Sequence, residues 1–203
     1  MRTEYKNYFE LLSNSLAQVN PHDLEQFEEL LFEAYQHNRQ IFIFGNGGSA
    51  ATASHVAGDF VKGASWGLTK KFRFICLNDN MTALMAIAND SSYEDVFVEP
   101  LKNFLNSGDL VIGISGSGNS SNVVKALEYA KANSNTTVAL SGFKGGKIKE
   151  LARLSVHVPV MDMEVTEDAH LAIFHTIKQC LIKRLTGTQD QSMGSVYDQR
   201  VKQ

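Results

Sequence analysis

The sequence predicts an α/β fold: a flavodoxin-like three-layer sandwich with a five-stranded parallel sheet in the order 2-1-3-4-5 and helices on both faces. Three observations predict it. Short apolar runs alternate along the chain with segments of helical periodicity, which is typical of βαβ units. The runs are continuously apolar, as expected of strands buried on both faces. Most of them end in small polar residues, and right-handed crossovers leave few ways to connect such strands.

The chain begins with two amphipathic segments, over residues 4–18 and 23–37, joined by a short connection. Their apolar residues recur at helical spacing, so we expect an antiparallel helical hairpin within residues 1–38. Apolar faces on a pair of terminal helices suit a contact with a partner chain in an oligomer. They suit the covering of the domain's own sheet equally well, and the residues leave both interpretations open.

The rest of the domain alternates between strands and helices. Strands are expected at Ile41–Phe44, Phe72–Leu77, Leu110–Ile114, Thr136–Leu140 and Leu154–Val158. Helices are expected over 48–62, 80–89, 93–105, 120–132, 145–152 and 165–185. In a parallel sheet of this order the ligand lies beyond the carboxyl ends of the strands, at the point where the strand order reverses.

Length and composition exclude several classes of protein. The 203 residues fit one domain, expected at 1–185, followed by a polar tail at 186–203 that we expect to be mobile. A net charge of −3 disfavours nucleic acid as a partner, and no apolar run is long enough to cross a membrane. Cys76 and Cys180 each lie in an apolar run, which predicts two buried thiols rather than a disulfide, and a cytoplasmic location.

Two loops that follow predicted strands carry glycine and hydroxyl groups. Gly45-Asn46-Gly47-Gly48-Ser49 follows the first strand, and Ser115-Gly116-Ser117-Gly118-Asn119-Ser120 follows the third. Glycine lets the backbone approach a ligand closely, and hydroxyls, amides and a helix N-terminus can bind a phosphate without Lys or Arg. The alternatives are a tight turn for the first loop and a flexible linker for the second. The strand–loop–helix position of the second loop favours a phosphate site.

Two pairs of candidate ligands lie on predicted helices. His55 and Asp59 are four residues apart, so they share a helix face and could hold a metal ion or form an acid–base pair. Glu167 and His175 are eight residues apart, which places them about 80° apart around a helix. The structural alternatives are a surface ion pair for the first two and helix-dipole compensation for Glu167. Two histidines and two carboxylates together suit a divalent metal such as zinc, although the spacing alone does not bring the two helices together.

These motifs resemble the sugar isomerase (SIS) domain family, and within it the phosphoheptose isomerase branch. The resemblance extends to about Leu185 and rests on five segments in the expected order: Gly45–Ser49, Ala88–Asp90, Ile114–Ser120, Leu140–Gly146 and Glu167 to His175. It implies a cytoplasmic homotetramer with active sites at subunit interfaces and one zinc ion per site. It also implies the isomerisation of sedoheptulose 7-phosphate to D-glycero-D-manno-heptose 7-phosphate, for the synthesis of lipopolysaccharide or capsule heptose.

The resemblance also implies roles for individual residues. It implies that the substrate is bound by Asn46, Gly47, Gly48, Ser49, Asn89, Asp90, Ser115, Gly116, Ser117, Ser120 and Glu167. It implies that the metal is held by His55, Asp59, Glu167 and His175. Asp59 and Glu167 depart from the family, which usually has Glu and Gln at these positions. The shorter Asp59 draws its carboxylate back by about 1.5 Å, the length of one carbon–carbon bond.

The implied reaction is an aldose–ketose isomerisation through an enediol. Asp59 is our first candidate for the base, Glu167 is the second, and His175 would move a proton between the substrate oxygens. A carboxylate that binds a metal tightly cannot easily serve as a free base, so the two roles of Asp59 conflict. The alternatives are an isomerase of another phosphosugar and a non-catalytic module that binds a phosphosugar or a protein. The presence of His175 and of both loops favours an enzyme.

Overall fold

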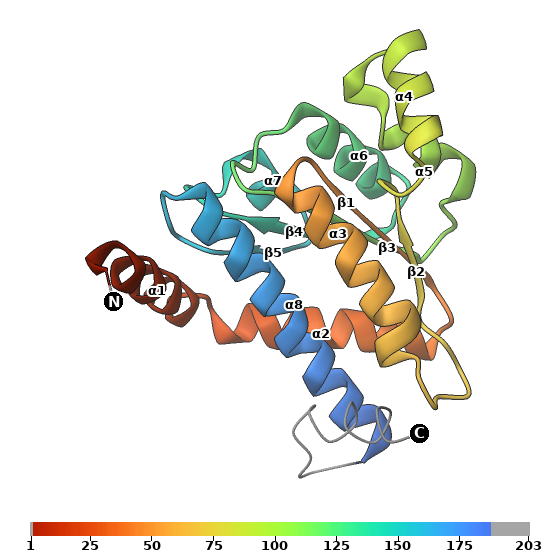
Figure 1. Cartoon of the computed structure of the whole chain (residues 1–203). Coiled ribbons are helices and arrows are strands. Elements are labelled where there is room, and N and C mark those ends of the chain that lie inside the picture. Colours follow the sequence, from red (N-terminus) through yellow and green to blue (C-terminus); the bar gives the residue numbers. More distant parts are fainter. Residues whose placement is uncertain (1, 188–203) are drawn as a thin grey trace.

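A parallel sheet of five strands lies at the centre of the fold, in the order β2-β1-β3-β4-β5 (Figure 1). The computed structural model describes residues 2–187 of the chain. Its strands are β1 (Gln40–Gly45), β2 (Arg73–Cys76), β3 (Leu110–Ser115), β4 (Thr136–Ser141) and β5 (Leu154–His157). The predicted fold class and strand order are confirmed, and each predicted strand end lies within one residue of the observed one. All but the first two residues of the predicted tail at 186–203 lie outside the described residues.

The helices follow the predicted segments closely. They are α1 (Thr3–Ala17), α2 (Pro21–Gln36), α3 (Gly48–Gly58), η1 (Asp59–Ala64), α4 (Met81–Asp90), η2 (Tyr93–Asp95), α5 (Val98–Phe104), α6 (Ser121–Ala132), α7 (Gly146–Leu151) and α8 (Met163–Thr186). None of the helices in residues 2–187 is both long and apolar enough to cross a bilayer. Cys76 and Cys180 are both free thiols, but only Cys76 is buried as predicted. Cys180 is exposed, because it lies on the outer side of α8.

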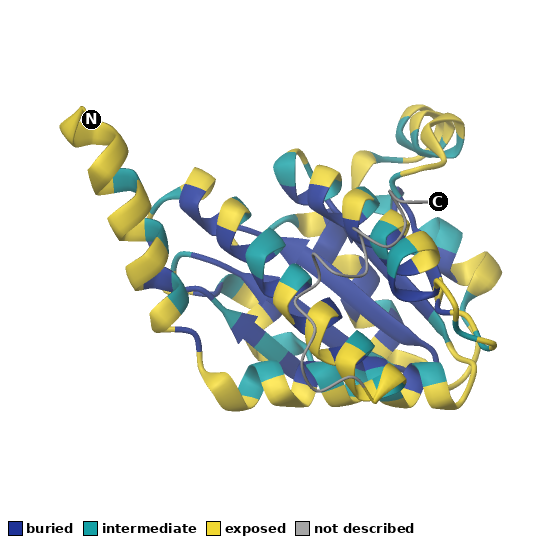
Figure 2. Cartoon of the chain, turned by 60° about the horizontal axis from the view of Figure 1, so that its bottom comes forward, coloured by how far each residue is buried: buried dark blue, intermediate teal, exposed yellow. Residues whose placement is uncertain are grey.

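Two apolar clusters fill the space on the two faces of the sheet. Ile41 and Ile43 of β1 point to one face, where α2, α3 and α8 cover them, while Phe42 and Phe44 point to the other face, covered by α5, α6 and α7. Figure 2 shows the central strands almost wholly buried, between helices whose outer sides are exposed. Burial on both faces explains why the strand sequences are continuously apolar.

The two N-terminal helices are present, but they do not pack on each other as the predicted antiparallel hairpin. Helix α1 packs mainly against α8, and α2 packs against α8 and β5. Asn20 accepts a hydrogen bond from the amide of His22 and Pro21 is the first residue of α2, which starts that helix in a new direction. The hydroxyl of Tyr8 donates to Asp168 of α8 at 2.6 Å, so α8 supplies the partner that α2 was expected to supply.

The predicted helix over 48–62 is divided into two parts. Helix α3 ends at Gly58, and the chain continues from Asp59 to Ala64 as a π-helix, in which each turn contains one additional residue. Phe60 and Ala64 remain buried in the core, whereas His55 and Asp59 face the neighbouring α8. Short π-helical segments are frequent at functional sites, and here the segment begins at a predicted site residue.

Candidate active site

A cavity of about 240 Å³ lies at the carboxyl ends of β1 and β3, where the strand order reverses. It is lined by Asn46, Gly47, Ser49, Ile114, Ser115, Gly116, Ser117, Ser120, Met163 and Glu167. The structure therefore brings the two predicted loops and one predicted residue of α8 to a single site. None of these lining residues is Lys or Arg, so an anion bound here would depend on hydroxyls, amides and the N-terminus of α6.

The serine loop is held in shape by its own hydrogen bonds and by the neighbouring loop before α7. The hydroxyls of Ser115 and Ser120 lie 3.0 Å apart, and the amide of Gly118 donates to the carbonyl of Ser115 at 2.9 Å. Gly118 has a φ of +68°, and a Cβ atom there would overlap the carbonyl of Gly145. The segment Leu140–Gly146, which the resemblance singled out, therefore supports the serine loop from behind.

Asn46 is fixed by two residues that the sequence analysis did not identify. Its side chain exchanges two hydrogen bonds with the buried Asn122 of α6, at 2.9 and 3.0 Å. The hydroxyl of Tyr93 donates to the same Oδ1 atom of Asn46 at 2.9 Å. Asn122 lies two residues after the last serine of the loop, a proximity that could have pointed to it. Tyr93 is distant in sequence and gave no such signal.

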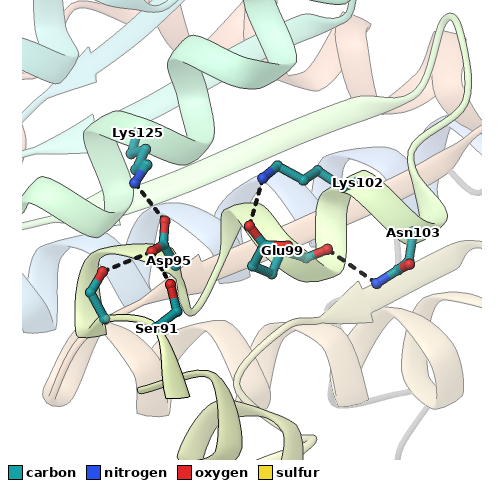
Figure 3. Close-up of polar contacts among 7 residues, drawn as sticks. Ser91, Asp95, Glu99, Lys102, Asn103 and Lys125 are labelled. Atoms are coloured by element: carbon teal, nitrogen blue, oxygen red, sulfur yellow. Dashed lines mark hydrogen bonds and ion pairs between the residues drawn. The ribbon is translucent and has the colours of Figure 1, made fainter. Parts of the chain in front are cut away.

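A polar cluster holds the segment that carries Tyr93 (Figure 3). Lys125 of α6 forms an ion pair with Asp95 at 2.5 Å, and the hydroxyls of Ser91 and Ser92 donate to the other carboxylate oxygen at 2.6 and 2.8 Å. The pKa of Asp95 is held well below its usual range, first by Lys125 and then by the two serines. Asp95 therefore stays ionised at neutral pH and anchors η2 against α6.

Glu167 enters the cavity from the first turns of α8. Its carboxylate lies against Gly48, where a Cβ atom would overlap it unless the Glu167 side chain moved. Burial raises the pKa of the Glu167 carboxyl, and the nearby Glu164 and Asp168 add to the effect. Within the described residues its carboxylate has no hydrogen-bond or ion-pair partner. Glu167 is therefore a carboxylate whose pKa is shifted towards neutrality, facing the site.

Three predicted metal ligands meet where α3 and α8 cross. The Nε2 atoms of His55 and His175 lie 3.0 Å apart, and Oδ2 of Asp59 lies 3.6 Å from the first and 3.4 Å from the second. We call His55, Asp59 and His175 the triad. Glu167, the fourth predicted ligand, is not part of this group. Burial and then the charge of Lys178 lower the pKa of His175, against the opposing charge of Asp59, and so favour the neutral imidazole.

The triad fits a divalent metal ion in donor type and in spacing. Two imidazoles and a carboxylate are a common set of three protein ligands for catalytic zinc. Ligand atoms about 2.0–2.1 Å from a tetrahedral zinc ion are roughly 3.3 Å from one another. The three observed separations, 3.0, 3.4 and 3.6 Å, are close to that value.

Lys178 is a further residue that the sequence analysis did not identify. Its ammonium forms an ion pair with Oδ2 of Asp59, the oxygen that faces both histidines. It follows His175 by three residues on α8, and residues at this spacing share a helix face. This rule could have identified Lys178 once His175 had been singled out.

Asn89 and Asp90, which the resemblance implied as substrate contacts, lie away from the cavity at the end of α4. They are exposed, and the amide of Asn89 donates to the carboxylate of Asp90 at 2.8 Å. Helix α4 has no buried residue and projects from the body of the fold (Figure 1). Within one chain, the structure does not bring these two residues to the cavity.

Comparisons with known proteins give consistent relatives for most of the chain. Residues 4–142 match a family described as the SIS domain. A phosphoheptose isomerase of Helicobacter pylori (strain P12) is 37% identical over 182 residues, which cover 89% of this chain and 93% of the relative. A phosphoheptose isomerase of Aneurinibacillus thermoaerophilus is 39% identical over 161 residues, which cover 76% of this chain and 77% of the relative.

The similarity extends to a solved structure. Phosphoheptose isomerase GmhA from Neisseria gonorrhoeae aligns with a TM-score of 0.80 and 27% sequence identity. The alignment covers 88% of this chain and 94% of that chain. The overall architecture is therefore shared over most of both chains.

Proposed function

The chain belongs to the SIS-domain family, and we propose that it is a phosphoheptose isomerase, converting sedoheptulose 7-phosphate to D-glycero-D-manno-heptose 7-phosphate. The observation that carries the proposal is the cavity between the β1 and β3 loops. It combines a serine-rich loop at a helix N-terminus with the partly buried carboxylate of Glu167, on the helix that also carries His175. A phosphate site beside a base and a cluster of ligands is what a phosphosugar isomerase needs.

The serine loop is the proposed phosphate site. Ser115, Ser117 and Ser120 place their hydroxyls around the start of α6, whose dipole favours a negative charge. The sugar would extend from there past Asn46, whose amide is fixed by Asn122 and Tyr93. Because these donors are already hydrogen-bonded in place, little reorganisation is needed on binding.

Glu167 is the base that we propose, in preference to Asp59. Oδ2 of Asp59 already contacts two histidines and Lys178, whereas the Glu167 carboxylate faces the cavity with a raised pKa. A base with a pKa nearer the working pH transfers protons more effectively. Glu167 would take the proton from the carbon next to the ketose carbonyl, and return it to the neighbouring carbon of the enediol. We keep His175 as the residue that would move the second proton between the two oxygens, a role that requires its imidazole not to be bound to the metal at that step.

We propose zinc as the metal of the triad, held by His55, Asp59 and His175. A bound divalent ion would act as a Lewis acid on the carbonyl oxygen. We also propose a homotetramer in the cytoplasm, with Asn89 and Asp90 reaching a neighbouring subunit's site. The exposed position of these two residues on α4 supports that arrangement.

The experiment follows sedoheptulose 7-phosphate by proton NMR in D₂O with the full chain. We expect aldose signals, and deuterium at the carbon that receives the returning proton. Glu167→Gln should reduce turnover by about 10²–10⁴-fold, as expected for the loss of a general base. Glu128→Gln, on the exposed side of α6, is the control and should retain full activity.

Two outcomes would reject the proposal. If the wild-type protein binds the substrate without turnover, the chain is a phosphosugar-binding module. If Glu167→Gln retains full deuterium incorporation, the base lies elsewhere, and Asp59→Asn becomes the next variant to measure.

A further inference from the structure

Lys178 provides a positive charge inside the triad itself. Its ammonium pairs with Oδ2 of Asp59, and the two side chains are only 10% and 24% exposed. Asp59 is its one ion-pair and hydrogen-bond partner among the described residues. Lysine is rarely this buried unless its charge is paired, so the Asp59 carboxylate is what offsets the cost of burying the Lys178 ammonium.

The same oxygen would have to bind the metal. Oδ2 of Asp59 lies 3.4 Å from Nε2 of His175 and 3.6 Å from Nε2 of His55, so it is the carboxylate oxygen that completes the triad. A metal ion that binds Oδ2 competes with the Lys178 ammonium for the same oxygen, and the repulsion between the two cations favours displacement of the ammonium. The ammonium would then remain buried beside a divalent cation, which costs free energy through both desolvation and repulsion.

We propose that Lys178 competes with divalent metal ions for Asp59, and so weakens metal binding at the triad. The inference rests on the triad as a metal site and deepens the proposed function. It requires nothing of the substrate, so its test is made without substrate.

The test is calorimetric titration of the full chain with Zn²⁺, after treatment with a chelator. Lys178→Met removes the charge and keeps much of the side-chain volume. It should bind zinc at least tenfold more tightly than the wild type, which corresponds to about 1.4 kcal/mol. Lys183→Met removes the same charge from an exposed position on the same helix, and should bind zinc as the wild type does. Adding His55→Ala to Lys178→Met should abolish the gain, because the gain belongs to the triad.

A second measurement uses the wild-type protein and does not depend on how a variant folds. Acetylation of lysines, followed by mass spectrometry, should modify Lys178 slowly in the metal-free protein. Saturating zinc should increase its rate of modification, while the rate at Lys183 stays constant. Equal zinc affinities of wild type and Lys178→Met, or zinc binding that leaves the modification of Lys178 unchanged, would overturn the proposal. Loss of isomerase activity would not, since neither measurement involves turnover.

Discussion

The buried imidazole of His170 makes the stability of the fold depend on pH. His170 lies on α8 and is fully buried. Burial lowers its pKa to about 4, with a smaller contribution from His157 and an opposing one from the backbone of Ser141. In the unfolded chain a histidine titrates near 6.5. Between these two values the unfolded state binds more protons than the folded state, so stability falls as the pH decreases.

We expect the free energy of unfolding to decrease by about 2 kcal/mol through His170 as the pH falls from 6.5 to 5. The contribution is complete above pH 6.5 and is lost progressively down to about pH 4. Urea unfolding of the wild type and of His170→Leu at both pH values measures it. The variant should lose less stability than the wild type over this interval. His22→Asn, at an exposed position, should behave as the wild type, and an unchanged pH dependence in His170→Leu would contradict the assignment.

The short helix η2 does not line the cavity, but it is linked to it through Tyr93. It is only three residues long, and the Lys125–Asp95 ion pair fixes it against α6 (Figure 3). Through Tyr93 it reaches Asn46, so a surface ion pair positions a side chain in the site. Such a pair contributes little to global stability, and its effect should appear in substrate binding instead.

Tyr93→Phe removes one hydrogen bond from Asn46 and should raise KM for the phosphosugar by about 2- to 10-fold, with kcat nearly unchanged. Steady-state kinetics measures both constants. Tyr129→Phe, which removes a hydroxyl from α6, is the matched control and should leave KM unchanged. A fall in kcat with unchanged KM would instead mean that Tyr93 takes part in the chemical step.

The sequence predicted the elements well because their signals are local. Strands and helices were found from periodicity, and their order followed from the few allowed connections. Two features were missed because they depend on distant partners. The packing of α1 on α8 replaced the predicted hairpin, and the π-helix after Gly58 leaves the apolar pattern of a helix intact. The spacing of apolar residues predicts that a helix has an apolar face, but it does not say which other element will pack against that face.

For the whole molecule, the sheet separates two apolar cores that should respond independently to small changes. Ile43 belongs to the core under α2, α3 and α8, and Ile148 belongs to the core under α6 and α7. Ile43→Val and Ile148→Val should each reduce the free energy of unfolding by about 0.5–1.5 kcal/mol. The double variant should show the sum to within about 0.5 kcal/mol, because the sites share no contact. Urea denaturation measures all three, and a larger deviation would mean that the sheet transmits strain between its faces.

Part of the candidate site could be predicted from the sequence alone. Sequence motifs identified the two loops of the cavity and the three residues of the triad, because each motif is contiguous or lies on one helix. The meeting of α3 with α8 was not predictable from spacing. Tyr93 was missed for the same reason, since it acts on a residue far away in the chain. Lys178 also acts on a distant residue, Asp59, although its spacing from His175 could have pointed to it.

Glu167 and His175 lie on one helix, so helix geometry fixes the distance between their backbone positions. Eight residues at about 1.5 Å each separate their backbone positions by roughly 12 Å along the axis of α8. An insertion of one residue between them would increase this separation by about 1.5 Å, and would also rotate one side chain by about 100° around the helix relative to the other. The position of a functional group in the site can therefore be changed in small steps only through the length of its side chain. Asp59 lies opposite α8, at the start of η1, and Asp in place of Glu there draws the carboxylate back by one carbon–carbon bond, the smallest step that side-chain length allows.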